Sequence, residues 1–117
     1  MSAIKKKPDR RKIAVEYGSG NVFADLGLSN PEERLTKAIL ATQISDLIAE
    51  FGLTQQQAAA RLGIDQPKVS SIVRGRLRGF STDRLMSFLN ALDRDVIITI
   101  QPAKKNHPAS VRVLARA

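Results

Sequence analysis

The chain has 117 residues, which is the size of a single domain. It contains no cysteine, which excludes a disulfide scaffold, a thiolate zinc site and a cysteine nucleophile, and which suits the reducing cytoplasm. No apolar run approaches the roughly 18 residues of a membrane-spanning helix, and no apolar segment of a secretory signal follows the basic N-terminus. We therefore expect a cytoplasmic protein without a membrane partner.

The formal net charge of +8 is unevenly distributed along the chain. Residues 1–12 and 103–117 are basic and aperiodic, which predicts a disordered arm and a flexible tail around a domain at 13–102. Within that domain, residues 13–60 carry six acidic and two basic side chains, whereas residues 61–84 carry six basic and two acidic ones. A basic stretch inside a nearly neutral domain is typical of a polyanion site. The basic tails suit either non-specific attraction to that polyanion or ordinary solvation.

The chain begins with weak signals of structure. Residues 13–17 suit a short extended segment, and the glycines at 18 and 20 break the chain. Asn21 can cap a single helical turn that Gly27 closes.

The first long helix is predicted over roughly 31–51. Asn30 can cap it, Pro31 suits its first position, and Glu33 stands where a capping-box carboxylate belongs. Gly52 ends the helix. Apolar residues recur in it at helical spacing, namely Leu35, Ile39, Leu40, Ile44, Leu47, Ile48 and Phe51.

Two short helices follow. A capping box at residues 54–57 starts a helix over 55–62, which Gly63 ends. Asp65 caps a third helix over 66–74, and the apolar stripe of that helix consists of Val69, Ile72 and Val73.

A basic loop over 76–79 leads to a fourth helix, which Ser81 caps and which a hydrophobic staple between Phe80 and Leu85 supports. Its inward face is predicted to contain Leu85, Phe88, Leu89 and Leu92. The run of β-branched residues within 95–101 then predicts one strand, which Pro102 terminates.

That strand needs a partner, because one strand cannot satisfy its own backbone groups. The partner is either residues 13–17 of the same chain or the same strand of a second copy, and a strand with two edges can take both. We favour the second copy, which makes a two-fold dimer with Val96, Ile98 and Ile100 in an intersubunit antiparallel pair.

The two short helices, joined at residues 63–65, have the lengths, caps and intervening glycine turn of a helix-turn-helix. Ala58 and Ala59 are small enough for the helices to cross closely. Residues 53–75 resemble the helix-turn-helix of phage-repressor-like regulators (Cro/C1, or XRE), with Leu-Thr-Gln, Leu-Gly-Ile, Gln-Pro-x-Val-Ser and Arg-Gly all in register. More narrowly, residues 18–101 resemble small regulators of the HigA-type antitoxin group, above all at 18–28 and 76–81.

The resemblance implies a mainly α fold, a λ-repressor-like helical bundle, with the C-terminal strand added. It also implies that Gln55 binds a phosphate and that the exposed start of the third helix faces base edges. Glutamine can pair with adenine and lysine with guanine, whereas proline offers an apolar contact. The expected base-contacting residues are Gln66, Pro67, Lys68 and Ser71. The expected phosphate contacts, besides Gln55, are Arg74, Arg76, Arg78 and Ser70, although Ser70 could equally turn toward a base or solvent.

The sequence thus predicts a sequence-specific regulator of transcription, a repressor that binds a palindromic duplex operator as a homodimer. The alternative is a protein-interaction module that neutralises a small toxin, whose basic surface the acidic residues 13–60 would meet; one protein can do both. No enzyme is expected, because Ser70 and Ser71 have no base and the only histidine, His107, lies in the tail. No cofactor or metal site is expected either.

Overall fold

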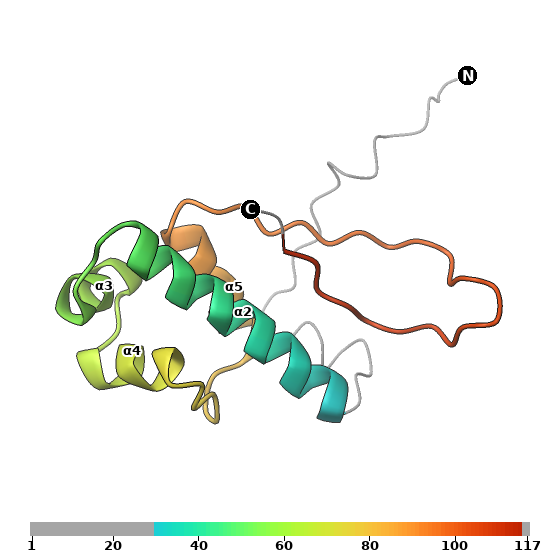
Figure 1. The fold of residues 1–117 in the computed structure, drawn as a ribbon, viewed down its shortest axis with the longest axis horizontal. Coiled ribbons are helices and arrows are strands. Elements are labelled where there is room, and N and C mark those ends of the chain that lie inside the picture. Colours follow the sequence, from blue (N-terminus) through green and yellow to red (C-terminus); the bar gives the residue numbers. More distant parts are fainter. Residues whose placement is uncertain (1–29, 116–117) are drawn as a thin grey trace, which may run out of the picture.

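The computed structural model describes residues 30–115 and contains four helices in that range (Figure 1). In chain order these are α2 (Asn30–Glu50), α3 (Gln55–Leu62), α4 (Gln66–Val73) and α5 (Thr82–Ala91). The three helix ranges predicted from the sequence are confirmed to within one residue at each end. The extended segment predicted at 13–17 and the helical turn predicted at 21–27 lie outside the described residues.

The predicted caps form the hydrogen bonds that begin three of the helices. The Gln57 amide donates to Thr54 Oγ1 at 3.0 Å, and the Thr54 amide donates to Gln57 Oε1 at 2.9 Å, which completes the capping box of α3. The Lys68 amide donates to Asp65 Oδ1 at 3.0 Å at the start of α4. The Arg84 amide donates to Ser81 Oγ at 3.1 Å at the start of α5. These bonds satisfy amides that have no partner inside their own helix.

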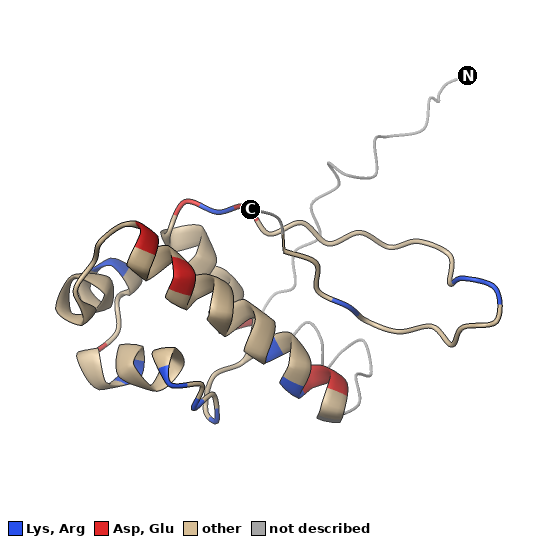
Figure 2. Cartoon of the chain, viewed as in Figure 1, with Lys and Arg blue, Asp and Glu red and all other residues tan. Residues whose placement is uncertain are grey.

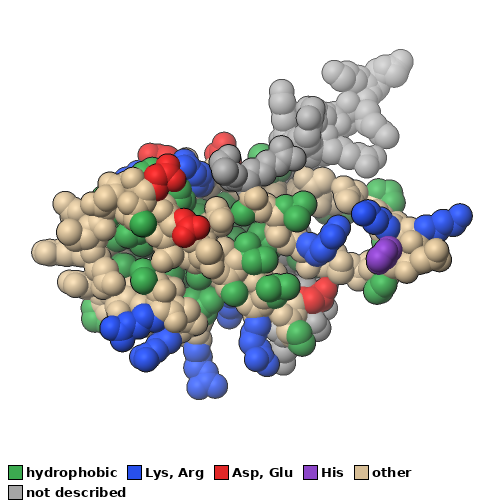
Figure 3. All heavy atoms as spheres, viewed as in Figure 1, with side chains coloured by type: hydrophobic (Ala, Val, Ile, Leu, Met, Phe, Trp, Pro, Cys, Tyr) green, Lys and Arg blue, Asp and Glu red, His purple; other side chains and the backbone are tan. Residues whose placement is uncertain are grey.

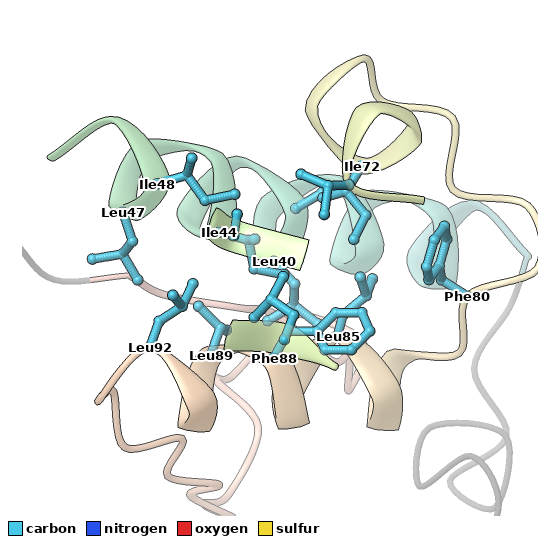
Figure 4. Packing of buried hydrophobic residues seen from close by; sticks show 14 of the residues in the cluster. Leu40, Ile44, Leu47, Ile48, Ile72, Phe80, Leu85, Phe88, Leu89 and Leu92 are labelled. Atoms are coloured by element: carbon cyan, nitrogen blue, oxygen red, sulfur yellow. The ribbon is translucent and has the colours of Figure 1, made fainter. Parts of the chain in front are cut away.

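The core lies mainly between α2 and α5, which face each other along their apolar sides (Figure 4). Side chains from α4 and from the start of α5 close it at one end. The predicted staple residues Phe80 and Leu85 are both buried, and the Phe80 ring meets the Phe88 ring edge-on with 6.2 Å between centroids. Figure 4 labels ten core residues: Leu40, Ile44, Leu47, Ile48, Ile72, Phe80, Leu85, Phe88, Leu89 and Leu92.

Two apolar residues that the sequence pattern assigned to the buried faces of α2 and α4 are exposed instead. Leu35 is 63% exposed at the start of α2, and Val73 is 41% exposed at the end of α4. The buried stripe of α2 passes through Thr36, which is only 2% exposed and precedes Leu40 and Ile44 at spacings of four residues. One residue of offset turns a helical side chain by about 100°, so Leu35 falls off the stripe.

Residues 94–115 leave the end of α5 as a long loop that extends away from the helices and then returns (Figure 1). It turns back where the His107 amide donates to the Lys104 carbonyl at 3.1 Å. On the return, the Val111 amide donates to Glu32 Oε2 at 3.3 Å, and Val113 packs against the core. The loop therefore ends beside the first turn of α2.

The strand predicted at 95–101 does not form in the structure, and residues 30–115 contain no strand at all. A strand requires a neighbour that supplies backbone hydrogen bonds, and no described segment pairs with this one. Of the three residues expected in the intersubunit pair, Val96 is half-buried against the core, whereas Ile98 and Ile100 are exposed.

Candidate nucleic-acid interface

The turn between α3 and α4 depends on Gly63. Its φ of +73° lies in the left-handed region, and its amide donates to the Ala59 carbonyl at 2.9 Å. A Cβ at Gly63 would meet nothing within 4 Å, so the requirement for glycine is conformational and not steric. Ala58 and Ala59 are both buried where α3 packs against α4, as the close crossing of the two helices requires.

Helix α4 is anchored by one side and free on the other. Val69 and Ile72 are buried in the core. Helical spacing places Pro67, Ser70 and Arg74 on the opposite side of the helix from these two residues. Among the expected base-contacting residues, Gln66, Pro67 and Lys68 are exposed and Ser71 is half-buried. The structure therefore places all four at least partly in solvent on one short helix whose apolar side is packed into the core.

Lys68 is the one expected base contact that has an ionic partner. Its Nζ atom lies 3.6 Å from Asp65 Oδ2, and both side chains are at least half exposed. Exposed pairs of this kind contribute about 0–1 kcal/mol, so the lysine can leave the carboxylate at little cost. Asp65 keeps its second role as the cap of α4, because that role uses its other oxygen, Oδ1.

Arginines continue the basic surface beyond the end of α4. Arg74 follows the last residue of the helix, and Arg76 and Arg78 lie in the loop that leads to α5. All three are exposed, and none is paired with another described residue. The Arg76 amide donates to the Ser71 carbonyl at 2.8 Å, which holds the loop against the helix end. Figure 2 shows these basic residues on the same side as α4.

Two other arginines of the basic stretch have structural partners. Arg61 donates from Nε to the Ala91 carbonyl at 3.1 Å, forms an ion pair with Asp93 at 2.9 Å, and lies 5.2 Å from the Phe51 ring centroid. These contacts join α3 to the end of α5. Arg84 lies 5.6 Å from the centroids of both Phe80 and Phe88, as a cation over aromatic rings. Neither of these two was among the expected phosphate contacts.

The remaining expected phosphate contacts differ in their place on the helices. Gln55 is the first residue of α3, directly after its capping box, and is half-buried. Ser70 is also half-buried, in the middle of α4. Anions are stabilised at a helix N-terminus by its free amides and its dipole, which is the environment that Gln55 occupies.

The space-filling view places most of the Lys and Arg side chains of the helical part along one edge (Figure 3). That edge runs from α4 over the following loop to the first half of α2. Acidic side chains lie over the second half of α2 and also at its first turn, which contains Glu32 and Glu33 (Figure 2). Between residues 30 and 115, no group of three or more acidic, His or Cys side chains could hold a metal ion. No helix in that range is long and apolar enough to cross a membrane.

Comparison with known proteins agrees with this geometry. A family model described as a helix-turn-helix domain matches residues 22–101. A solved structure named "Putative XRE Family Transcriptional Regulator" is similar with 46% sequence identity and a TM-score of 0.72. The match covers 75% of this chain and 100% of that one. No curated protein matches the chain.

Proposed function

Because the chain belongs to this helix-turn-helix domain family, whose fold binds DNA, we propose that it is a sequence-specific regulator that represses transcription as a homodimer on a palindromic operator. The observation that carries the proposal is the free polar face of α4 beside the unpaired Arg74, Arg76 and Arg78. A helix of this width fits the major groove of B-DNA. Repression then follows sterically wherever the operator overlaps a promoter.

The proposed DNA contacts on α4 and beside it are of two kinds, to bases and to phosphates. Gln66 and Lys68 carry the hydrogen-bonding groups that distinguish adenine and guanine in the major groove. Pro67 and Ser71 complete this surface with an apolar contact and a hydroxyl. Gln55, Ser70 and the three arginines contact phosphates, which position the domain without reading sequence.

Single substitutions separate these two kinds of contact. Gln66→Ala or Lys68→Ala is expected to weaken binding to the best site by about 1–3 kcal/mol and to relax the preference for it. Arg76→Ala is expected to weaken binding to every sequence alike. Selection of bound duplexes from a random pool, followed by titration of the selected and scrambled sites, measures both effects. Unchanged affinity and preference in both α4 variants would show that α4 does not read the bases.

The dimer is supported by the apolar surface of the C-terminal loop. Ile97 is 65% exposed and Ile100 is 76% exposed, and a second copy would supply the backbone partner that this segment lacks within residues 30–115. Pairing of Val96, Ile98 and Ile100 across a two-fold axis would bury part of this surface. A two-fold dimer that reads successive major grooves holds its α4 helices about 34 Å apart.

Ile98→Pro tests this arrangement, because proline removes a backbone donor and is excluded from the interior of a paired strand. At a protein concentration on the order of tens of micromolar, the wild type is expected to sediment as a dimer and the variant as a monomer. Thr99→Ala, which keeps every backbone donor, is the matched control and is expected to remain dimeric. A wild-type monomer, or a variant that remains fully dimeric, would assign the half-site geometry to another surface.

A second candidate function is neutralisation of a small basic toxin, which the resemblance to HigA-type antitoxins suggests. Asp46 and Glu50 are exposed on the second half of α2, and a basic partner could bind these two carboxylates. Such a partner would displace Arg94 from Glu50, which it pairs with at 3.7 Å, and would lie beside the groove that Asp46 lines with Gly75 and Leu77. Co-expression with the product of an adjacent small gene tests this role. A stable complex that relieves growth inhibition would support it, and separate elution of the two proteins would argue against it.

A further inference from the structure

The basic edge continues past the loop that follows α4. Figure 3 shows Lys and Arg side chains along the same edge as far as the first half of α2. Helix α2 contains only two basic residues, Arg34 and Lys37. Neither belongs to the helix-turn-helix itself, which begins about 20 residues later in the chain.

A groove lies between α2 and the loop after α4, so it adjoins both the helix that contains Arg34 and the loop that contains Arg76 and Arg78. Ala38, Thr42 and Asp46 of α2 line it together with Gly75 and Leu77. The Asp46 carboxylate is at the end of the groove opposite to Arg34, about 18 Å from it along the α2 axis. Arg34 precedes Ala38 by four residues, so it lies one helical turn further along the same face of α2. The α2 wall of the groove therefore leads directly from the loop that carries Arg76 and Arg78 to Arg34.

Arg34 is exposed and is paired with no other described residue. The two acidic residues that precede it in α2, Glu32 and Glu33, interact with other residues. Glu33 forms an ion pair with Lys37 at 3.7 Å. Glu32 lies about 200° around the helix from Arg34 and accepts the Val111 amide of the returning C-terminal segment. Of the two basic residues in α2, Arg34 is thus the one whose charge is available to a ligand.

We propose that Arg34 binds a backbone phosphate of the operator, outside the base pairs that α4 reads. The inference rests on the proposed DNA-binding function and extends its contact surface to α2. Thr42 and Arg34 are separated by about 12 Å along the α2 axis, a length over which B-DNA presents several successive phosphates. A guanidinium can donate two parallel hydrogen bonds to one phosphate, which makes arginine the suitable residue for this contact.

The experiment measures the dissociation constant of the full chain for the selected operator duplex as a function of salt. Arg34→Ala is expected to lower the slope of log K against log salt by about one unit per protomer and to leave the preference between sequences unchanged. The loss is expected on a duplex with long flanks and not on one trimmed to the bases that α4 protects. Arg34→Lys keeps the charge and is expected to keep most of the slope.

Arg94→Ala is the matched control. Arg94 is an equally charged, exposed arginine at the far end of α5, where it pairs with Glu50 at 3.7 Å and lies 5.7 Å from the Phe51 ring centroid. Its loss is expected to leave the slope unchanged. If Arg76→Ala lowers the slope and Arg34→Ala does not, the role of Arg34 is refuted while the DNA-binding function stands. If the wild type itself shows no salt-dependent binding, the DNA-binding function is refuted as well.

Discussion

Ile44→Ala is expected to lower the free energy of unfolding by about 2–5 kcal/mol. Ile44 is fully buried in the middle of α2, where its side chain points toward α5 (Figure 4). Truncation removes buried methyl and methylene groups and leaves a cavity between the two helices, which cannot close because both are held by neighbouring core contacts. Urea denaturation of the wild type and the variant, monitored by helical circular dichroism, measures the loss.

Leu35→Ala is the matched control for that prediction. It is an aliphatic truncation on the same helix, but Leu35 is 63% exposed and lies off the buried stripe. The expected change in the free energy of unfolding is within about 0.5 kcal/mol, as for other surface substitutions. A loss at Leu35 as large as that at Ile44 would mean that this face of α2 is covered in solution, and the assignment of the stripe to Thr36 would then be wrong.

Affinity for the operator is expected to fall by about 10³–10⁵ between roughly 50 and 200 mM salt if the protein binds as a dimer. Each protomer presents four exposed basic side chains on α4 and the following loop, Lys68, Arg74, Arg76 and Arg78. Because Lys68 is assigned to a base, the three arginines of each protomer give about six phosphate contacts in a dimer, which release the corresponding counterions. Fluorescence anisotropy of a labelled duplex, titrated at several salt concentrations, gives the slope.

The slope also reports how many copies bind. One protomer with three phosphate contacts is expected to lose only about 40-fold in affinity over the same range. Combining Arg74→Gln, Arg76→Gln and Arg78→Gln should flatten the slope in either case, since these side chains carry most of the contacts. Arg61→Gln is the contrasting substitution: its arginine pairs with Asp93 and the Ala91 carbonyl, so it is expected to change stability and not the slope. A flat response of the wild type would exclude DNA as the partner.

Where each helix begins and where the central turn falls could be predicted from the sequence, because each depends on bonds between residues a few positions apart. The capping box of Thr54 and Gln57, the caps at Asp65 and Ser81, and the left-handed Gly63 all involve backbone within one helical turn. The polar face of α4 followed from the same local order, since Val69 and Ile72 had to point inward. The helix-turn-helix was thus determined by the sequence alone.

Only the tertiary structure decided which charges are free and which apolar residues are buried. Arg61 and Arg84 resemble Arg76 and Arg78 in the sequence, yet they are held by the rings of Phe51, Phe80 and Phe88. The partners of Arg61 are Phe51, directly after α2, and Asp93, directly after α5, at separations that no local pattern encodes. The partners of Arg84 are only four residues away on either side, at ordinary helical spacing. A small rotation of α2 against α5 likewise decided that Thr36 is buried and Leu35 is not.

The C-terminal segment shows most clearly that contacts between distant segments cannot be predicted from local sequence. Its β-branched composition predicts a strand, but a strand forms only where a second backbone runs beside it, and composition cannot supply that neighbour. The structure instead leads residues 103–115 back to α2, where the Val111 amide meets Glu32, 79 positions away in the chain. Capping bonds are determined within a turn of helix, whereas this return and the groove between α2 and the loop after α4 depend on packing between distant segments.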